Sequence, residues 1–200
     1  MPLVSERSNF VKSQILRAQP AELPTLQTER LLLRRILRRD IDDMYEYSRL
    51  PLVTRYLLWD PHPHRRHTES YIEYLQTEYR MGKYHEFAVV LKEMDKMIGT
   101  CGFVSFDKEN NAAEVGYVLN PAFHNCGYAT EALRCVLTYG FEALHLHRIT
   151  AKYMIANRQS RRVMEKCGMT YEGDLRDGAI VKGKYETIGI CSILSHEFLK

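Results

Sequence analysis

The sequence predicts an α/β fold of the α+β type, with a mixed, mostly antiparallel central sheet and helices on both of its faces. Three strand-like runs, at residues 85–91, 97–106 and 112–119, follow one another with short turn signals between them, as in an antiparallel meander. The third run leads into a helical pattern at 127–144 and then into a further strand-like run at 148–156. A strand, a helix and a second strand in this order require parallel pairing of the two strands, so we expect a mixed sheet.

Length and composition are typical of a single globular domain. The chain has 200 residues, of which 45% are hydrophobic and 26% are charged, and its formal net charge is +3. This composition supports a sizeable core, and the small net charge does not favour nucleic-acid binding. No apolar run approaches the roughly 18 residues of a membrane span, and Met1–Pro20 lacks the apolar centre of a secretory signal. We therefore expect a cytoplasmic protein without a membrane or nucleic-acid partner.

The first half of the domain is expected to contribute one strand and two helices. Residues 28–35 read as the strand, Asp40 is a plausible N-cap for the first helix, and Pro51 stops that helix. Residues 53–64 contain two prolines and read as a loop. Residues 68–81 bring apolar side chains to one face at helical spacing, which predicts the second helix.

The two ends of the chain differ in character. Residues 1–24 read as an N-terminal extension with one short helical possibility at Phe10–Ala18, and residues 25–200 read as the domain itself. Near the C-terminus, a helix is expected at residues 159–167, closed by Gly168 as a C′ glycine. The last strands are expected at residues 171–174 and 184–198.

The turn between the strand at 112–119 and the following helix is polar and contains one glycine, Gly127. Pro121 ends the strand because it lacks the amide that a sheet ladder needs. A helix that begins after such a turn presents unpaired amides and the positive end of its dipole, which together attract an anion. The turn therefore predicts a phosphate site. It is not a P-loop, since no Lys-Ser/Thr pair follows Gly127, and a dinucleotide fingerprint would need three glycines.

Five cysteines are an odd number, and no pair of them has close metal-ligand spacing. The sequence therefore suggests neither a disulfide framework nor a zinc site, and no metal is expected. Most of the cysteines read as small, buried apolar residues. Cys126 is the exception, because it lies in the predicted anion site, where exposure and nearby helix amides favour a reactive thiolate. The alternative is an incidental loop residue.

The segment from His124 to Thr130 resembles motif A of the GCN5-related N-acetyltransferase (GNAT) superfamily, Gln/Arg-x-x-Gly-x-Gly/Ala, which wraps the pyrophosphate of coenzyme A. His124 takes the Gln/Arg place, Gly127 that of the first glycine and Ala129 the Gly/Ala place. From about Thr25 to the C-terminus, further segments stand in family order and together resemble the RimJ/RimL subgroup. These segments are residues 28–34, 113–117, 127–132, 157–160 and 165–169.

The resemblance implies an enzyme that uses acetyl-CoA as co-substrate and transfers its acetyl group directly to an amine within a ternary complex. RimJ/RimL members acetylate the N-termini of ribosomal proteins or other amines. One alternative is an acetyltransferase of a small-molecule amine, such as a polyamine, an aminoglycoside or an amino-acid-like compound. Another is a non-catalytic acetyl-CoA-binding module. A homodimer is an open possibility.

The resemblance also implies where the substrates bind. The strand at 112–119 would splay from the strand at 148–156, the pantetheine arm would enter the gap, and the acetyl group would lie near Val118 and Leu119. Asn157 would bind the pantetheine arm, and the helix-loop-helix region before residue 81 would border the acceptor. The pyrophosphate would contact a loop formed by His124, Asn125, Cys126, Gly127, Tyr128, Ala129 and Thr130.

Attack of an amine on a thioester requires a base, a stabilised oxyanion and protonation of the departing thiolate. Glu114 is a carboxylate in an otherwise apolar strand and is the candidate base, acting directly or through water. Its alternative role is that of an edge-facing residue with a salt-bridge partner. The resemblance points to Ser160 as the acid and ranks Tyr153 below it. Asn157 and its neighbours have the alternative role of capping a helix, since Asn and Ser are favoured there.

Two departures from the subgroup bear on the site. The subgroup commonly has Trp-Gly-Lys-Gly where this chain has His124-Asn125-Cys126-Gly127, so a glycine and a lysine are missing. Loss of the lysine weakens phosphate attraction, whereas Asn125 tolerates a left-handed backbone better than most residues. Some ribosomal members use a late glutamate near the position aligned with Ala179, so Glu114 or a water chain has to serve as the base here.

Overall fold

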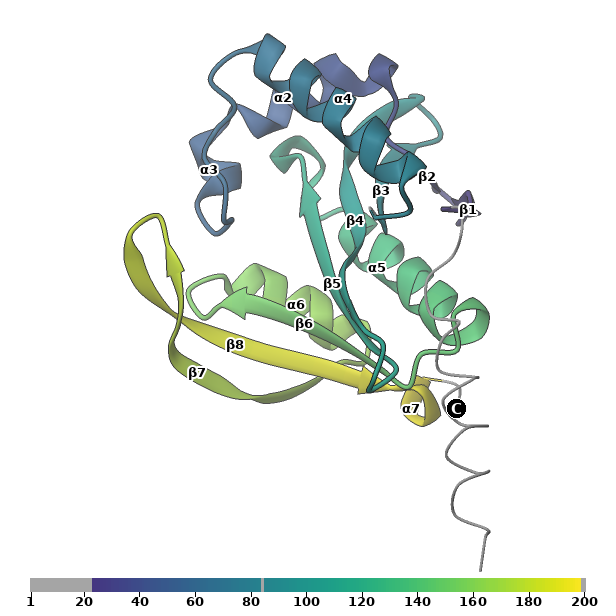
Figure 1. Ribbon diagram of the computed structural model, residues 1–200, viewed down its shortest axis with the longest axis vertical. Helices are drawn as coiled ribbons and strands as arrows, with labels where there is room; N and C mark the ends of the chain where they lie inside the picture. Colours follow the sequence, from purple (N-terminus) through teal and green to yellow (C-terminus); the bar gives the residue numbers. More distant parts are fainter. Residues whose placement is uncertain (1–22, 84, 199–200) are drawn as a thin grey trace, which may run out of the picture.

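The computed structural model describes residues 23–83 and 85–198 and has an eight-stranded sheet at its centre. The strand order is β1-β2-β3-β4-β5-β6-β8-β7 (Figure 1). All neighbouring strands are antiparallel except β5 and β6, which are parallel, so the predicted mixed, mostly antiparallel sheet is confirmed. The strands are β1 (Leu26–Gln27), β2 (Leu31–Arg34), β3 (His85–Leu91), β4 (Lys96–Asp107), β5 (Ala112–Leu119), β6 (Arg148–Met154), β7 (Thr170–Val181) and β8 (Lys184–Leu194).

Helices cover both faces of the sheet, as predicted. Helices α2 and α4 lie over one face, and α5 and α6 lie over the other (Figure 1). The longer helices are α2 (Ile41–Ser48), α4 (Arg65–Arg80), α5 (Tyr128–Thr138) and α6 (Arg158–Lys166). The shorter helical segments are η1 (Arg38–Asp40), α3 (Pro51–Thr54), η2 (Pro121–Phe123), the π-helical η3 (Tyr139–Ala143) and α7 (Ser195–Phe198).

Strand β3 shows why both faces of the sheet are buried. Its successive side chains point to opposite faces, so they alternate between two hydrophobic clusters. Phe87 and Val89 pack into the cluster that contains α5, whereas Ala88 and Val90 pack into the cluster that contains α2 and α4. A strand buried on both faces reads as a continuous apolar run, which is how residues 87–91 appear in the sequence.

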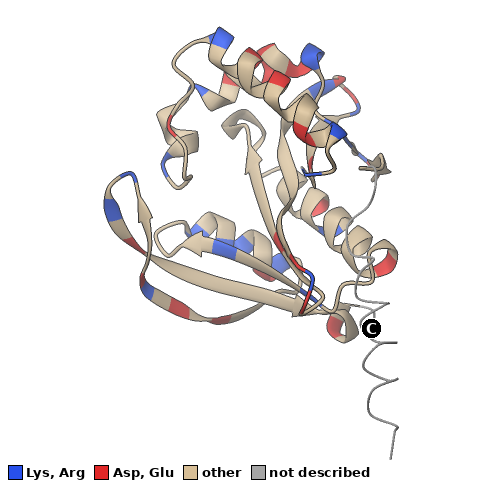
Figure 2. Ribbon diagram, in the orientation of Figure 1, with Lys and Arg blue, Asp and Glu red and all other residues tan. Residues whose placement is uncertain are grey.

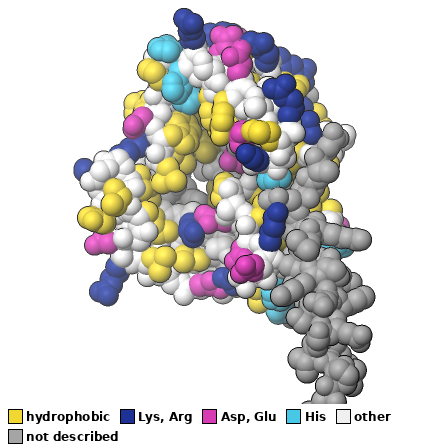
Figure 3. Space-filling view, viewed as in Figure 1, with side chains coloured by type: hydrophobic (Ala, Val, Ile, Leu, Met, Phe, Trp, Pro, Cys, Tyr) yellow, Lys and Arg dark blue, Asp and Glu magenta, His cyan; other side chains and the backbone are white. Residues whose placement is uncertain are grey.

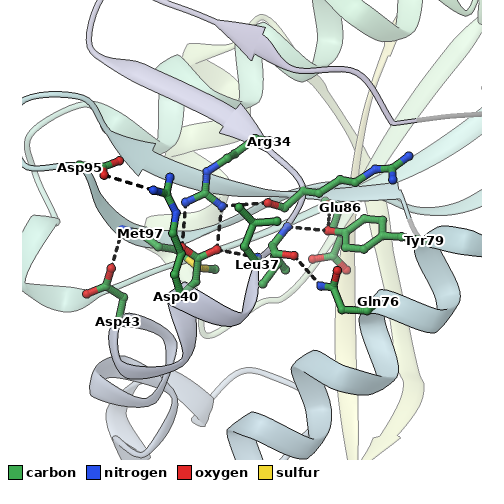
Figure 4. Close-up of polar contacts among 12 residues, drawn as sticks. Arg34, Leu37, Asp40, Asp43, Gln76, Tyr79, Glu86, Asp95 and Met97 are labelled. Atoms are coloured by element: carbon green, nitrogen blue, oxygen red, sulfur yellow. Dashed lines mark hydrogen bonds and ion pairs between the residues drawn. The ribbon is translucent and has the colours of Figure 1, made fainter.

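Polar contacts fix α4 to the sheet at the segment that follows β2. The Tyr79 hydroxyl accepts a hydrogen bond from the Ile36 amide (3.2 Å) and donates one to the Glu86 carbonyl (2.7 Å) (Figure 4). The Gln76 side-chain amide donates to the Ile36 carbonyl (2.7 Å). One helix therefore satisfies the backbone groups of a segment that has left the sheet ladder.

The two halves of the sheet separate where β5 and β6 diverge. The parallel pair is in register only between Ala112–Val115 and Arg148–Ala151. Beyond this point β5 stays paired with β4 as far as Leu119, and β6 stays paired with β8 as far as Met154. Each strand follows its antiparallel neighbour, so the two diverge (Figure 1). The splayed strand pair that the resemblance implied is therefore present.

The segment around α2 differs from the prediction. Asp40 precedes α2, but its side chain does not cap that helix. Its carboxylate instead accepts hydrogen bonds from the Arg34 guanidinium (2.7 and 2.8 Å) and the Leu37 amide (2.7 Å) (Figure 4). A bidentate arginine is a stronger partner than a helix amide. In addition, α2 already ends at Ser48, and Pro51 opens α3, which runs into the loop predicted at residues 53–64, because proline fits the first turn of a helix.

The C-terminal hairpin also differs from the prediction. Strand β7 is much longer than the run predicted at residues 171–174, because two register shifts along it break the alternation that marks a strand. The strand predicted at 184–198 ends at Leu194 and gives way to α7. Lys182 and Gly183 form the turn between the strands, both with positive φ (50° and 79°), as a tight two-residue hairpin requires.

The remaining elements follow the prediction closely. The predicted helix at 127–144 is α5 continued by η3, and Gly168 closes α6 with a left-handed backbone (φ 84°). The helix predicted at Phe10–Ala18 lies outside the described residues. None of the helices in residues 23–83 and 85–198 is both long and apolar enough to cross a membrane. Basic and acidic residues are spread over the described part of the molecule (Figure 2).

Candidate active site

A cavity of about 1040 Å³ opens beside α2, where β5 and β6 diverge. Its walls come from segments far apart in the sequence, namely α2, the loop between α3 and α4, α4 itself, six strands from β3 to β8, and α6. The space-filling view shows hydrophobic side chains around the hollow (Figure 3). The shape of the cavity therefore depends on the separation of the two halves of the sheet.

The cavity brings together some of the predicted site residues and not others. Those that line it are Glu114, Val118, Asn157 and Ser160. Leu119 is 8% exposed and packs into the cluster around α5, so its side chain is turned away from the cavity. The predicted loop residues His124–Thr130 are not among the described residues that line the cavity; they lie at the N-terminus of α5.

The loop before α5 turns sharply into the helix. Asn125 (φ 62°) and Gly127 (φ 83°) adopt left-handed backbone conformations, which asparagine and glycine tolerate best. The His124 Nε2 donates a hydrogen bond to the Leu119 carbonyl (3.1 Å). Within the described residues, no acceptor pairs with the backbone amides of residues 125–130. The loop thus offers several amide donors at a helix start, which fits a pyrophosphate group.

Arg30 and Glu131 fix this loop to the segment before β2, and we call the pair the Arg30–Glu131 clamp. The Arg30 Nη1 donates to the Cys126 carbonyl (3.0 Å), and its Nε donates to Glu131 (2.6 Å). The same guanidinium lies over the Tyr128 ring, 4.5 Å from its centroid. Glu131 also accepts hydrogen bonds from the Thr28 hydroxyl (2.5 Å) and the Arg30 amide (3.0 Å).

Electrostatics at the clamp favour a charged Glu131. Burial alone would raise the pKa of Glu131, but the hydrogen bonds from Thr28 and Arg30 outweigh burial and lower the pKa below its usual value. Sequence reasoning missed the clamp. The sequence did hold one indication of the clamp, because Arg30 and Glu131 belong to two of the segments that stand in family order.

The cysteines divide largely as predicted. Cys101, Cys167 and Cys191 are buried, whereas Cys126 is exposed in the loop before α5. The Cys126 thiol lies 3.4 Å from the His124 carbonyl oxygen. Its exposure satisfies one requirement for reactivity, and the reactivity itself stays a prediction.

Glu114 lies in the part of β5 that is still paired with β6. Its Oε2 forms an ion pair with the Lys152 ammonium of β6 at 2.7 Å, and the side chains are 25% and 46% exposed. The salt-bridge partner that the alternative interpretation required is therefore present. The position in the cavity that a base requires is present as well, and the catalytic role of Glu114 stays a prediction.

Ser160 lies in the first turn of α6, where two contacts fix it. The Asn157 Oδ1 accepts a hydrogen bond from the Ser160 amide (3.2 Å), so Asn157 caps α6, as its alternative role required. The Tyr117 hydroxyl lies 2.9 Å from the Ser160 Oγ and 2.8 Å from the Ser160 carbonyl oxygen. Tyr153, the other candidate acid, also lines the cavity. Sequence reasoning missed Tyr117, because nothing along the chain shows that it reaches α6.

The fold agrees with the comparisons to known proteins. The family model described as Acetyltransferase (GNAT) domain matches residues 30–170. The chain belongs to the GNAT acetyltransferase family. The N-acetyltransferase p20 of Bacillus licheniformis is 35% identical over 176 residues, which are 88% of this chain and 99% of p20. A crystal structure of a GNAT-family acetyltransferase from Bacillus anthracis is 30% identical and has a TM-score of 0.78, covering 87% of this chain and 100% of that chain.

A third relative carries a narrower name. YdaF of Bacillus subtilis, named provisionally as a ribosomal N-acetyltransferase, is 37% identical over 101 residues, which are 49% of this chain and 55% of YdaF. The predicted membership of the GNAT superfamily is thus confirmed. The finer assignment to the RimJ/RimL subgroup stays a prediction.

GNAT enzymes use acetyl-CoA as co-substrate, and this GNAT acetyltransferase has groups that fit it. The amides of residues 125–130 fit the pyrophosphate, and the diverging edges of β5 and β6 leave backbone groups that suit the amides of a pantetheine arm. Asn157 and Ser160 stand at the same gap. Among the described residues, no group of three or more His, Cys, Asp and Glu side chains is arranged to hold a metal ion.

The end of the cavity beside α4 is aromatic. Trp59, His62 and Tyr71 line it, and the His62 ring centroid lies 5.3 Å from that of Trp59 and 5.9 Å from that of Tyr71. The His62 Nδ1 lies 3.0 Å from the Ser48 Oγ and 2.7 Å from the Thr68 Oγ1. Burial lowers the pKa of His62 to about 4, so the ring is uncharged at neutral pH. This end of the GNAT cavity offers a largely aromatic surface that suits an apolar group.

Lys182, at the tip of the β7–β8 hairpin, closes one side of the cavity. Its ammonium donates a hydrogen bond to the Thr54 carbonyl at the end of α3 (2.8 Å) and lies 3.5 Å from Asp60. Leu175 and Ala179 of β7 line the cavity beside this contact. The hairpin therefore bridges the two halves of the GNAT domain (Figure 1).

Proposed function

We propose that this GNAT acetyltransferase transfers the acetyl group of acetyl-CoA to a primary amine at a protein N-terminus, by direct attack within a ternary complex. The observation that carries the proposal is that one cavity joins the gap between β5 and β6 to the aromatic end beside α4. A thioester bound in the gap and an amine bound at the aromatic end would meet directly. Holding both in one site supplies the proximity that such a reaction needs.

The base and the donor to the departing thiolate each have a candidate residue in the cavity, Glu114 and Ser160. Acetyl-CoA supplies the thioester when bound, held by the amides of residues 125–130 and by Asn157. Lys152 bonds to the Oε2 of Glu114, and Oε1, which has no bonded partner among the described residues, accepts the amine proton directly or through water. Ser160 donates its hydroxyl hydrogen toward the sulfur as the carbon–sulfur bond breaks.

Exposed apolar side chains around the cavity favour a protein acceptor over a polyamine. Leu58 (78% exposed), Val104 (50%) and Leu175 (48%) all line it. The residues that follow an N-terminal amine can cover such side chains, whereas a polyamine offers further charges and little apolar surface. The provisional name of YdaF supports a ribosomal protein as acceptor and thus the RimJ/RimL subgroup. A ribosomal acceptor would place the reaction in the cytoplasm.

Release of free coenzyme A from acetyl-CoA tests this proposal. The purified protein is supplied with peptides that carry the N-terminal sequences of ribosomal proteins, with spermidine and with an aminoglycoside, and N-terminally blocked copies of the peptides serve as matched controls. We expect thiol release and a mass gain of one acetyl group with the free peptides alone. Activity with spermidine or the aminoglycoside alone would support a small-molecule enzyme, and binding of acetyl-CoA without turnover of any acceptor would support a non-catalytic module.

A further inference from the structure

Tyr117 lies at the point where the two halves of the sheet separate. It is two residues beyond Val115, the last residue of β5 in register with β6. Its hydroxyl crosses to the first turn of α6, where it lies 2.8 Å from the Ser160 carbonyl oxygen and 2.9 Å from the Ser160 Oγ. Among the described residues, Tyr117 is the only hydrogen-bond partner of the Ser160 hydroxyl. Both side chains line the cavity.

A count of hydrogens shows that this contact has two arrangements. The Ser160 carbonyl can only accept, so when Tyr117 donates to it, the Ser160 hydroxyl has to donate to the Tyr117 oxygen. In that arrangement Ser160 presents only lone pairs to the cavity. When Tyr117 donates to the Ser160 Oγ instead, the single hydrogen of Ser160 is released and can point into the cavity. The two arrangements differ only by rotation about two C–O bonds.

We propose that Tyr117 is a positioning residue for acetyl transfer, whose hydroxyl turns from the Ser160 carbonyl to the Ser160 Oγ and so directs the serine hydrogen at the sulfur of coenzyme A. This inference rests on the proposed function, because it needs a thioester at the gap between β5 and β6. It assigns to Tyr117 a role that depends on its hydroxyl and not on its ring.

The step balances without a proton leaving Tyr117. The amine nitrogen forms a bond to the acetyl carbon, the carbon–sulfur bond breaks, and its electron pair stays on sulfur as a thiolate. From an acceptor ammonium, one hydrogen remains on the amide, one ends on the thiol, and one is released to solvent. Ser160 contributes a hydrogen bond to the thiolate while the charge develops, and the thiol is completed by a proton that the amine has lost.

Burial of Tyr117 suits this role. Burial raises the pKa of Tyr117, so the phenol remains a hydrogen-bond donor throughout the neutral and mildly alkaline range. A donor behind the Ser160 oxygen polarises the serine O–H bond, since successive hydrogen bonds strengthen one another. Tyr117 would therefore act through Ser160 without contacting the substrate itself.

Binding of coenzyme A as a function of pH tests this inference without any acceptor. The probes are coenzyme A and its S-methyl thioether, which cannot ionise, and the variants are Tyr117→Phe, Ser160→Ala and Tyr139→Phe. Tyr139→Phe is the control, because it also removes a tyrosine hydroxyl but lies outside the described cavity lining. A donor aimed at sulfur favours the thiolate and lowers the pKa of the bound thiol below its value in free coenzyme A.

A lowered pKa of the bound thiol makes the affinity for coenzyme A depend on pH. Between pH 6.5 and 9.5, the affinity of the unmodified protein for coenzyme A, relative to the thioether, should rise about tenfold, since the thiol ionises more readily in the complex than in solution. The rise should shrink to twofold or less in Tyr117→Phe and Ser160→Ala and persist in Tyr139→Phe. In the transfer assay Tyr117→Phe should lower kcat with little change in the KM for acetyl-CoA, and add nothing to the defect of Ser160→Ala.

Two outcomes would overturn the inference in distinguishable ways. If Tyr117→Phe keeps the full pH-dependent rise, the hydroxyl does not direct Ser160 at the sulfur, although the proposed function stands. If the unmodified protein binds neither coenzyme A nor its thioether, the proposed function fails and this inference fails with it.

Discussion

At the scale of single residues, Glu114 forms an ion pair and also lines the cavity, where it is the proposed base. Its contact with Lys152 is close, at 2.7 Å, but the lysine side chain is almost half exposed. Ion pairs with this exposure are worth about 1 kcal/mol or less, because water screens the charges and the lysine side chain loses entropy in the contact. That is small beside the several kcal/mol that a positioned base contributes to a transition state. The ion pair is therefore no obstacle to proton transfer.

Glu114→Gln should slow acetyl transfer without weakening the binding of acetyl-CoA. The substitution keeps the shape of the side chain and removes the base, so kcat should fall by roughly 10²- to 10⁴-fold while the affinity for acetyl-CoA hardly changes. The defect should shrink as the pH rises above about 8, where an N-terminal amine is already neutral. The measurement is the rate of thiol release against pH with a working acceptor.

A matched control for Glu114 is available on the outer face of α6. Glu165 forms an ion pair with Arg161 at the same distance, 2.7 Å, but its side chain is more exposed (46%) than that of Glu114 (25%), and it is not among the described residues that line the main cavity. Glu165→Gln should keep the parental rate and pH profile. A Glu114→Gln protein that also keeps both would show that an ordered water or a spontaneously neutral amine replaces the base.

At the scale of elements, the start of α5 depends on the segment before β2. The backbone amides of residues 125–130 have no hydrogen-bond acceptor among the described residues, so contacts with other segments have to fix the conformation of the loop. The Arg30–Glu131 clamp does this, since it joins the Cys126 carbonyl, the Tyr128 ring and the first turn of α5. The missing lysine of the subgroup pattern removes one charge from the loop, which makes the placement of the amides more important.

The clamp predicts a stability that depends on pH. The folded-state pKa of Glu131 is lowered, so its contribution to the free energy of unfolding is present above its ordinary pKa of 4.5 and is lost as the pH falls through the lower folded value. Glu131→Gln removes this contribution. In urea unfolding, the parent should therefore exceed the variant in stability at pH 6, and the difference should vanish as the pH falls well below 4.5.

Binding distinguishes the clamp from an ordinary surface ion pair. We expect Glu131→Gln to weaken acetyl-CoA binding about tenfold with kcat nearly unchanged, since the loop is predicted to bind the pyrophosphate and not the reacting carbon. Equal affinity of parent and variant would show that the loop holds its conformation without the clamp.

At the scale of the whole molecule, two half-sheets meet at four residue pairs of β5 and β6 and again where Lys182 bridges to α3. A ligand that fills the cavity should contact both halves, because the lining includes β3, β4, β5, α2 and α4 on one side and β6, β7, β8 and α6 on the other. A ligand between them should therefore stabilise the domain as one unit.

Acetyl-CoA is expected to raise the melting temperature of the protein. A ligand at a hundredfold excess over its Kd adds about 2.7 kcal/mol to the free energy of unfolding. For a domain of this size that corresponds to a rise of about 5 to 11 °C. Differential scanning fluorimetry with and without acetyl-CoA measures it, and an unchanged melting temperature in the unmodified protein would contradict the assignment of the cavity.

Alanine variants of Gly127 and Gly82 distinguish a loss of acetyl-CoA binding from a general loss of stability. Gly127 and Gly82 both have positive φ (83° and 64°), so alanine strains the backbone at either position. Gly127→Ala also places a methyl group in the loop that is predicted to bind the phosphates, 3.4 Å from the Arg30 guanidinium, whereas nothing lies within 4 Å of a methyl group at Gly82. Both variants should melt at a lower temperature, but only Gly127→Ala should lose most of the rise with acetyl-CoA.

The sequence alone determined the features that depend on local chemistry. Pro121 and Gly127 mark the end of β5 and the start of α5, and alternating or continuous apolar runs mark β3, β4 and β5 at nearly their observed bounds. The order of a strand, a helix and a further strand was sufficient to predict the one parallel pair. The superfamily was predicted from a resemblance carried by the motif around Gly127 together with further segments in family order, and from local chemistry the turn at Gly127 predicted an anion site before a helix.

Only the tertiary structure decided what the site residues contact. The sequence around Asp40 is typical of a helix N-cap, but in the structure its carboxylate is bound by the guanidinium of Arg34 and does not cap the helix. Lys152 and Tyr117 join Glu114 and Ser160 across strand and helix boundaries, and these contacts depend on where β5 leaves β6. The exposed, twice-shifted β7 has no apolar alternation, so its length follows from pairing with β8. Contacts between distant segments depend on packing in three dimensions, and packing leaves no periodic pattern along the chain.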